Sequence, residues 1–244
     1  WRAFSQWRTS WLSREGVAAI LTLGTFGLYS IGVLFFGIYL SWLGWIAAAL
    51  AAFTVFTTSM IYTQLKTVPR WATGWTPLAF LSFALAGSLL LLATLLALFG
   101  APHARVTGQW AMAAMLLAWL VKWQWWRHAA TATLKNAGSD TGAATGLGHI
   151  GEVKPFEPPN TSPNYLMREM IFSVGRTRAR AIGRIAVGSG AILPLLLLAL
   201  GVYFGFAGPL LLLALLAHIV GLLAERWLFF AEAEHAVGAY YGLR

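Results

Sequence analysis

The feature that most constrains this chain is the length of its uncharged runs. No Asp, Glu, Lys or Arg occurs between Glu15 and Lys66, and two later runs, 71–104 and 185–224, also lack these residues. A soluble domain, in which about a quarter of the residues are charged, does not leave such stretches. A helix needs about 20 apolar residues to cross the roughly 30 Å hydrocarbon core of a bilayer. The sequence therefore predicts an all-α, polytopic transmembrane helix bundle.

Breaks that contain charges, prolines or glycines divide the chain into six apolar runs. The predicted spans are residues 16–40, 45–65, 77–99, 110–134, 185–206 and 209–230. Pro194 is expected to kink the fifth of them. The one long polar segment, residues 136–184, is expected to be a functional loop within a single integral membrane domain that comprises residues 1–244.

The distribution of basic residues predicts the orientation. If the six spans cross alternately, only Arg105 of the 17 Lys and Arg residues falls on the side opposite the N-terminus. The positive-inside rule then places both termini and the long loop in the cytoplasm, which indicates a multi-pass protein of a bacterial inner membrane. The net charge of +9 does not indicate nucleic-acid binding, because the basic residues lie at helix ends rather than on one soluble face.

Redox centres held by this chain are not expected. Cysteine is absent, so disulfides, iron–sulfur clusters and thiolate-ligated metals are excluded. His218 lies near the middle of the sixth span, but no second histidine lies at a matching depth for a bis-histidine haem, so His218 is expected to bond to a neighbouring helix. Arg226 is expected to pair with Glu234, or Glu225 with a basic residue of another helix, because residues 225 and 226 should point in different directions.

Residues 1–16, WRAFSQWRTSWLSREG, place arginines, tryptophans and one carboxylate at the mouth of the first span. Arg2, Arg8 and Arg14 suit anionic lipid headgroups, and tryptophans suit the membrane interface. Glu15 has two interpretations. It is either a proton carrier at a quinone pocket, because quinone chemistry moves protons with electrons, or a carboxylate favoured by the helix dipole, with Ser13 as the cap.

Polar side chains also gather in the second span, in the half that ends near Lys66. They are Thr57, Thr58, Ser59, Tyr62 and Gln64. Such a stripe lines either a ligand cleft or a contact between helices.

Several segments resemble the DmsC-like membrane anchor subunits of complex iron–sulfur molybdoenzymes. They are WRAF with RTSWLSRE, MIYTQLKTVPRW with WTPLAF, ATGLGHIGEV with EPPNTSPNYLMREM, and ERWLFFAEAEHAVGAYYG. The resemblance implies an anchor that holds a four-cluster ferredoxin-like iron–sulfur subunit and a molybdopterin catalytic subunit at the membrane. It implies electron exchange with menaquinone or ubiquinone without a haem. It also implies eight spans in the full protein, with two spans and a His-Leu-Gly motif upstream of Trp1.

The resemblance assigns roles to particular residues. The quinone-site glutamate of the family stands where SREG places Glu15, which is therefore the expected catalytic residue. The candidate quinone-binding residues are Arg2, Trp11, Arg14, Tyr62 and Lys66. The candidates for docking the iron–sulfur subunit, in the long loop, are Tyr165, Arg168 and Glu169.

The segments RTSWLSRE and EPPNTSPNYL are most similar to sulfite-oxidising anchors, and a cytoplasmic basic side suits such an enzyme better than one exported with a twin-arginine signal. We therefore expect quinone reduction by a cytoplasmic sulfite dehydrogenase. The alternatives are a quinol-oxidising anchor of a DMSO reductase-type enzyme, a non-redox membrane tether and a transporter. A transporter predicts charged or broken helices at mid-membrane depth, and apart from His218 and Pro194 the spans have neither.

Overall fold

The computed structural model describes residues 1–154, 156–157 and 173–236, without the side chains of residues 2–3 and 173–177. Every regular element in this part of the chain is a helix. The elements are α1 (Arg2–Ser5), α2 (Trp11–Phe36), α3 (Ser41–Thr63), α4 (Trp75–Leu98), α5 (Ala104–Thr131), α6 (Thr141–Thr145), α8 (Ser173–Val187), the π-helix η1 (Gly188–Ile192), α9 (Leu193–Phe204) and α10 (Gly208–Ala231). Six helical segments are long and apolar enough to cross a membrane, which confirms the predicted fold class.

The helix boundaries differ from the predicted ones where caps and loops were misread. Helix α2 begins before residue 16 because Ser10 is its N-cap and accepts a hydrogen bond from the backbone N–H of Ser13, at 3.5 Å. The expected cap, Ser13, is instead buried inside the helix. Helix α2 ends at Phe36 and is capped by Gly37, whose φ of 65° lies in the left-handed region that glycine adopts readily. Helices α5 and α8 start earlier than expected, inside segments that were predicted to be loops.

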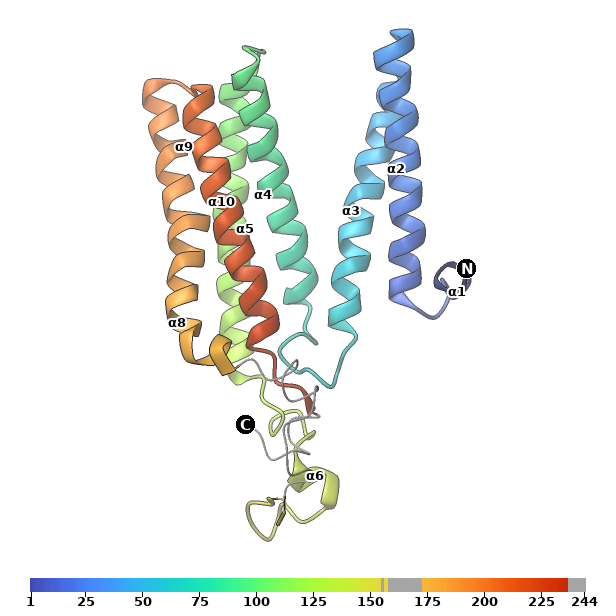
Figure 1. Cartoon of the computed structure of the whole chain (residues 1–244), viewed down its shortest axis with the longest axis vertical. Helices are drawn as coiled ribbons and strands as arrows, with labels where there is room; N and C mark the ends of the chain where they lie inside the picture. The colour runs from blue at the N-terminus through green and yellow to red at the C-terminus, as the bar shows by residue number, and fades with distance from the viewer. Residues whose placement is uncertain (155, 158–172, 237–244) are drawn as a thin grey trace.

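The helices form a four-helix body and a separate pair (Figure 1). The body consists of α4, α5, α10 and the continuous segment α8–η1–α9, and a core of alanine, leucine, methionine and phenylalanine side chains fills it. The pair consists of α2 and α3, and it contacts the body through α3 and α4. The pair and the body lie closest at the end where α3 passes into α4 (Figure 1).

Inside the body, α10 and η1 touch backbone to backbone. A Cβ atom added to Gly221 would lie 2.1 Å from the Cα atom of Gly190, so only glycine fits there. The carbonyl of Gly190 accepts a hydrogen bond from Trp119 Nε1 at 3.1 Å, and His218 Nδ1 lies 2.9 Å from the same oxygen. A kink was expected at Pro194, and the helix there is irregular over the π-helical residues Gly188–Ile192, which precede the start of α9 at Leu193. The expected interhelical hydrogen bond of His218 is confirmed.

The chain between α3 and α4 is tied to the ends of α5 and α10. Arg70 donates hydrogen bonds to the backbone carbonyls of Ala129 and Glu232, at 3.3 and 2.9 Å. Trp71 Nε1 donates to the carbonyl of Phe229 at 2.9 Å. These bonds connect the short linker that follows the α2–α3 pair firmly to the body.

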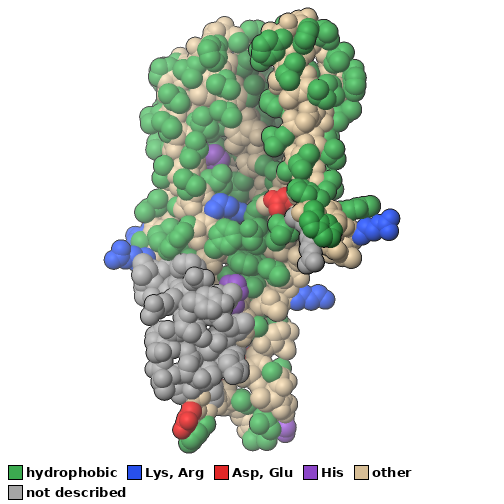
Figure 2. All heavy atoms as spheres, turned by 45° about the vertical axis from the view of Figure 1, so that its right-hand side comes forward, with side chains coloured by type: hydrophobic (Ala, Val, Ile, Leu, Met, Phe, Trp, Pro, Cys, Tyr) green, Lys and Arg blue, Asp and Glu red, His purple; other side chains and the backbone are tan. Residues whose placement is uncertain are grey.

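One end of the bundle carries most of the polar connections. The N-terminal helix α1, the linker between α3 and α4, and the segment containing α6 all lie toward this end, and Arg105 lies in the first turn of α5 at the other (Figure 1). Figure 2 shows an apolar surface over the upper part of the molecule and charged side chains in a band below it. The arrangement matches the alternate crossing that was inferred from the sequence.

Candidate functional site

Polar side chains from four helices gather near the end of the bundle where α1 and the linker between α3 and α4 lie. At 1.5 Å per residue, Glu15 on α2 and Tyr62 on α3 each lie about 30 Å from the opposite end of their helix. Lys122 on α5 and Glu225 on α10 lie about 25 Å from the opposite ends of theirs. Since a hydrocarbon core is about 30 Å thick, all four reach the region of one membrane boundary.

Glu15 is held between the two helices of the pair. Thr58 Oγ1 donates a hydrogen bond of 2.6 Å to Glu15 Oε1, across a sequence separation that no local pattern predicts. Further into the bundle from these residues, hydroxyls also join the two helices, because Thr22 and Thr54 lie 3.0 Å apart at their Oγ1 atoms. Within the described residues, no cation forms an ion pair with Glu15.

The segment before α2 is fixed by Arg14. Its Nε and Nη2 atoms donate to the backbone carbonyls of Trp7 and Arg8, each at 2.8 Å. Its guanidinium lies 4.2 Å from the ring centroid of Trp11, and Trp11 meets Phe56 of α3 edge to face at 6.0 Å. Arg14 and Trp11 therefore hold the turn beside Glu15 against α3.

Tyr62 belongs to an aromatic cluster that joins α3 to the body. Its ring stacks on Phe80 at 5.8 Å and meets Trp71, Phe229 and Phe230 edge to face at 5.4 to 5.6 Å. This is the place where the pair, the linker after α3, α4 and α10 come together. A quinone-binding role for Tyr62 would therefore use a side chain whose ring is already fixed by its neighbours.

Three charged side chains form a cluster inside the body. Lys122 and Glu225 are each 1% exposed, and Lys122 Nζ forms an ion pair with Glu225 Oε1. Arg226 Nε lies 2.5 Å from Glu225 Oε2, and Lys122 Nζ lies 3.5 Å from the ring centroid of Trp125. The Lys122 ion pair confirms the alternative in which Glu225 pairs with a base of another helix.

One expectation about this cluster was wrong, and the sequence did not reveal that Lys122 is buried. The side chain of Lys122 points into the body, where Trp125 and Glu225 cover its ammonium group. Arg226 was expected to point away from Glu225, but its long side chain bends back to the neighbouring carboxylate. The sequence signal for Lys122 was a lysine among tryptophans in WLVKWQWW, which also suits an interfacial position.

Arg226 connects this cluster to the aromatic residues around Tyr62. Its guanidinium lies 4.4 Å from the ring centroid of Phe80 and 5.0 Å from that of Phe229. Its Nη2 atom is buried and has no hydrogen-bond partner among the described residues. Tyr62 is close enough to Glu15 and to Arg226 for both charges to act on its hydroxyl group.

The polar stripe of the second span does not act as one unit. Thr57 and Ser59 are fully buried and donate to backbone carbonyls of their own helix, at 2.8 and 2.6 Å. Gln64 is exposed at the helix end. Thr58 bonds to α2 and Tyr62 contacts the aromatic rings of the body, so the stripe combines a helix contact with a candidate site.

The remaining candidates have no described contacts that assign a role. Lys66 is located in the turn after α3. The side chain of Arg2 and the whole of Tyr165, Arg168 and Glu169 lie outside the described residues. In the described part of the chain no group of three or more His, Cys, Asp or Glu side chains is arranged to hold a metal ion.

Comparison with known proteins supplies the context for this site. The family model described as DMSO reductase anchor subunit (DmsC) matches residues 1–133. The chain is also similar to a curated protein of Allochromatium vinosum that is one of the subunits of sulfite dehydrogenase, with 28% identity over an alignment of 254 residues that covers 99% of this chain and 77% of the relative. No solved structure matches the chain.

Proposed function

Because this chain belongs to the DmsC family of DMSO reductase anchor subunits, we propose that it exchanges electrons between an iron–sulfur partner and membrane quinone. The chain is a membrane anchor subunit of a DMSO reductase-like or sulfite dehydrogenase complex. Its partners in this proposal are a four-cluster ferredoxin-like subunit and a molybdopterin catalytic subunit. The quinone is menaquinone or ubiquinone, bound close to Glu15.

The observation that carries the proposal is the Glu15 carboxylate, which is bound by Thr58 and has no described cation beside it. An ionisable side chain at the edge of a hydrocarbon core is costly, and it is usually kept for a function or a structural pair. The structural pair is absent for Glu15 among the described residues, whereas Glu225 has two cations. Glu15 is therefore the better candidate for proton transfer.

Reduction of a quinone by two electrons consumes two protons. Glu15 would take protons from water on its side of the membrane and donate them to the quinone oxygen, and Thr58 would hold the carboxylate in place. Trp11 and Tyr62 would offer aromatic rings to the quinone, and Arg14 fixes the turn that precedes Glu15. Arg226 would add a hydrogen-bond donor, because its buried Nη2 atom has no partner among the described residues. Arg2 and Lys66 remain candidate contacts.

We favour sulfite oxidation in the cytoplasm as the source of the electrons. The relative from Allochromatium vinosum belongs to a sulfite dehydrogenase, and the basic residues favour a cytoplasmic location for both termini and the long loop. In this scheme the iron–sulfur subunit docks on that side, with Tyr165, Arg168 and Glu169 as the candidate contacts. The family name supports the reverse reaction as the second candidate, in which quinol is oxidised for a DMSO reductase-type enzyme.

Purification of the tagged chain from its native membrane tests this proposal. We expect molybdenum, iron–sulfur clusters and sulfite-dependent quinone reduction in the purified complex. Removing the chain should abolish quinone-linked turnover and leave dye-linked turnover of the partner subunits. If the soluble partners reduced quinone equally well without this chain, the chain would be a tether. If the chain purified alone and bound a solute, it would be a transporter.

A further inference from the structure

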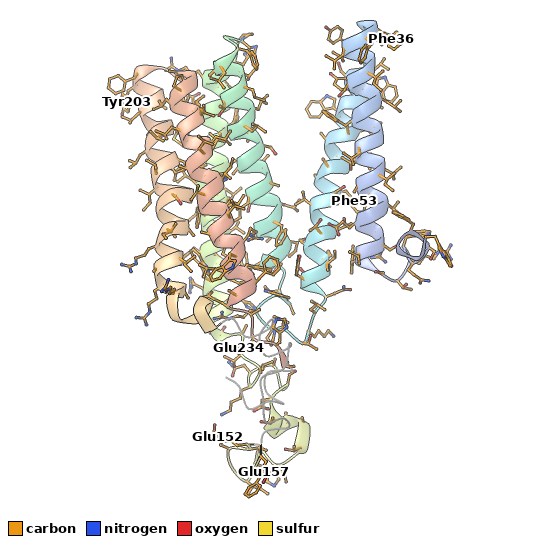
Figure 3. All side chains as sticks on the ribbon, viewed as in Figure 1. Phe36, Phe53, Glu152, Glu157, Tyr203 and Glu234 are labelled. Carbon is orange, nitrogen blue, oxygen red and sulfur yellow. The ribbon has the colours of Figure 1, made fainter. Side chains whose placement is uncertain are left out.

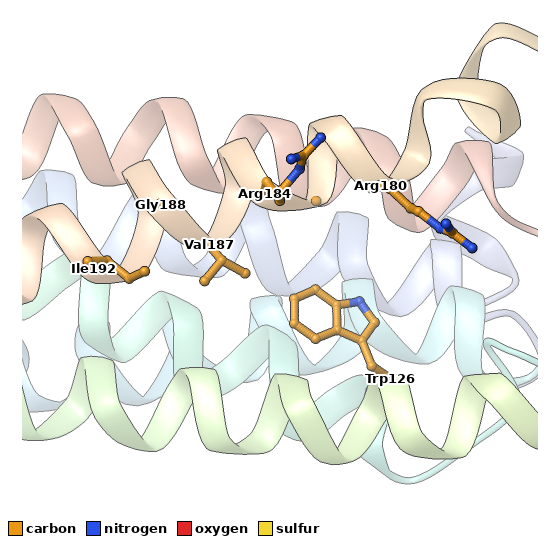
Figure 4. A pocket seen from close by; sticks show the side chains of 7 residues that line it. Trp126, Arg180, Arg184, Val187, Gly188 and Ile192 are labelled. Carbon is orange, nitrogen blue, oxygen red and sulfur yellow. The ribbon is translucent and has the colours of Figure 1, made fainter.

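A groove on the outer surface of the body lies between α5 and the start of the α8–η1 segment, away from the α2–α3 pair (Figures 1 and 4). Its volume is about 780 Å³. It is lined by Trp126, Arg180, Gly183, Arg184, Val187, Gly188 and Ile192. None of the residues that line the groove belongs to the Glu15 region, and the proposed electron exchange with quinone gives the groove no role.

The groove crosses one membrane boundary. At 1.5 Å per residue, Arg184 lies about 30 Å from Phe204 at the end of α9, and Trp126 lies about 30 Å from the first turn of α5. Both distances match the thickness of a hydrocarbon core, so the two side chains lie at the level of the headgroups. Ile192 lies about 12 Å further into the membrane than Arg184.

The two arginines of the groove have no compensating charge in the described part of the chain. Neither Arg180 nor Arg184 forms an ion pair with a described carboxylate. They stand one helical turn apart on α8, where two like charges destabilise each other. The cations inside the body are different, because Lys122 and Arg226 share the carboxylate of Glu225. An anion between Arg180 and Arg184 would relieve their repulsion.

The inner part of the groove is apolar and open. A Cβ atom added to Gly188 would touch nothing within 4 Å, so the absence of a side chain there leaves a channel along the helix. Val187 and Ile192 flank this channel, and Figure 4 shows Trp126 reaching from α5 toward Val187. Along the groove, the surface therefore changes from two cations to an apolar channel over about 12 Å. This distance corresponds to several methylene groups of an acyl chain.

We propose that this groove binds one anionic phospholipid. The phosphodiester accepts hydrogen bonds from Arg180 and Arg184, Trp126 packs beside the glycerol region, and one acyl chain lies along Val187, Gly188 and Ile192. A quinone would fill the apolar channel but has no charge to offset the guanidinium groups. In a zwitterionic lipid the choline cation would offset the charge of its own phosphate, so less negative charge would remain for the two arginines. A soluble protein partner would match the cations but would not reach the channel, which lies below the headgroups.

Native mass spectrometry of the purified complex in detergent, with phosphatidylglycerol or phosphatidylcholine added, tests the proposal. We expect preferential retention of phosphatidylglycerol by the wild-type complex. Each arginine near an anionic headgroup contributes about 1 kcal/mol, so each change to glutamine should weaken retention about fivefold. The double variant R180Q/R184Q should lose the preference. Arg178→Gln is the matched control, because Arg178 is on the same helix but does not line the groove.

A second variant tests the path of the acyl chain. Gly188→Leu leaves both arginines in place and fills the channel, so phosphatidylglycerol retention should fall while dye-linked activity is unchanged. Equal retention by the wild-type complex and by R180Q/R184Q would overturn the proposal, and so would equal retention of the two lipids by the wild-type complex. Loss of the iron–sulfur partner in R180Q/R184Q, with lipid retention intact, would instead identify the groove as a protein contact.

Discussion

The α2–α3 pair and the four-helix body each carry a carboxylate near the same membrane boundary, but the two carboxylates differ in burial and in partners. Only 6% of the apolar stretch of α2 is buried within the chain, compared with 39% of that of α10. Glu225 of α10 is enclosed and paired with Lys122 and Arg226, whereas Glu15 of α2 has a hydroxyl partner and a half-buried position. The charge of Glu225 is thus neutralised inside the body, whereas the accessible charge of Glu15 suits the proton transfer that we propose for it.

Removal of the buried carboxylate should give the largest loss of stability. Glu225→Ala leaves Lys122 and Arg226 without a counter-charge inside the body. Breaking a buried ion pair in this way costs about 3–5 kcal/mol, so we expect a large fall in the thermal unfolding temperature of the purified complex. Glu232→Gln is the control, because its ion pair with Arg70 is partly exposed and should contribute less than about 1 kcal/mol. Equal losses in the two variants would show that the cluster is not structural.

The close contact of α10 with η1 should be the next most sensitive position. In Gly221→Ala the new methyl group meets the backbone of Gly190 at 2.1 Å, and the helices must separate. Overpacking of this kind costs about 1–3 kcal/mol and should also weaken the bond from His218 to Gly190. The thermal unfolding temperature measures the effect. Gly188→Ala, in open space on the same segment, should change it little, and a similar change in both variants would contradict the importance of this contact.

The same comparison shows what the sequence could predict. Uncharged runs determined the number of spans, because the cost of a charge in hydrocarbon leaves few alternatives. The helix starts were less accurate, since Ser10 and Ser13 are both acceptable caps and only the backbone geometry chooses between them. The pairing of Lys122 with Glu225 depends on how α5 and α10 rotate against each other, which a sequence pattern at one helix does not contain.

The Glu15 region was found from the sequence by its charge and by the family resemblance. The geometry of this region could not be predicted from the sequence, because the hydrogen bond from Thr58 to Glu15 depends on how α2 is aligned along α3. The place of Tyr62 in the aromatic cluster also depends on tertiary contacts, since Phe80, Phe229 and Phe230 come from distant parts of the chain. The sequence therefore named the residues of the candidate site, and the fold supplies their partners.

Thr58→Val should have a small effect on stability and a larger one on function. The variant keeps the size of the side chain but removes the donor to Glu15. A hydrogen bond to a charged group contributes about 1.5–3 kcal/mol, so the geometry of the carboxylate should loosen and quinone-linked turnover should fall about tenfold. Thr58→Ser retains the hydroxyl and should restore most of the turnover. If Thr58→Val and Thr58→Ser were equally active, the hydrogen bond would have no part in the reaction.

Glu15→Gln tests the central claim most directly. The measurement is the ratio of quinone-linked to dye-linked turnover of the assembled complex, with Glu157→Gln as the control in an exposed segment far from the membrane boundary (Figure 3). Glutamine preserves the shape of the side chain and its contact with Thr58 but cannot carry a proton. We predict normal assembly and unfolding temperature, unchanged dye-linked turnover and a ratio reduced at least about tenfold, as expected for loss of a general acid or base. A ratio equal to that of the wild-type complex and of Glu157→Gln would contradict the assignment of Glu15.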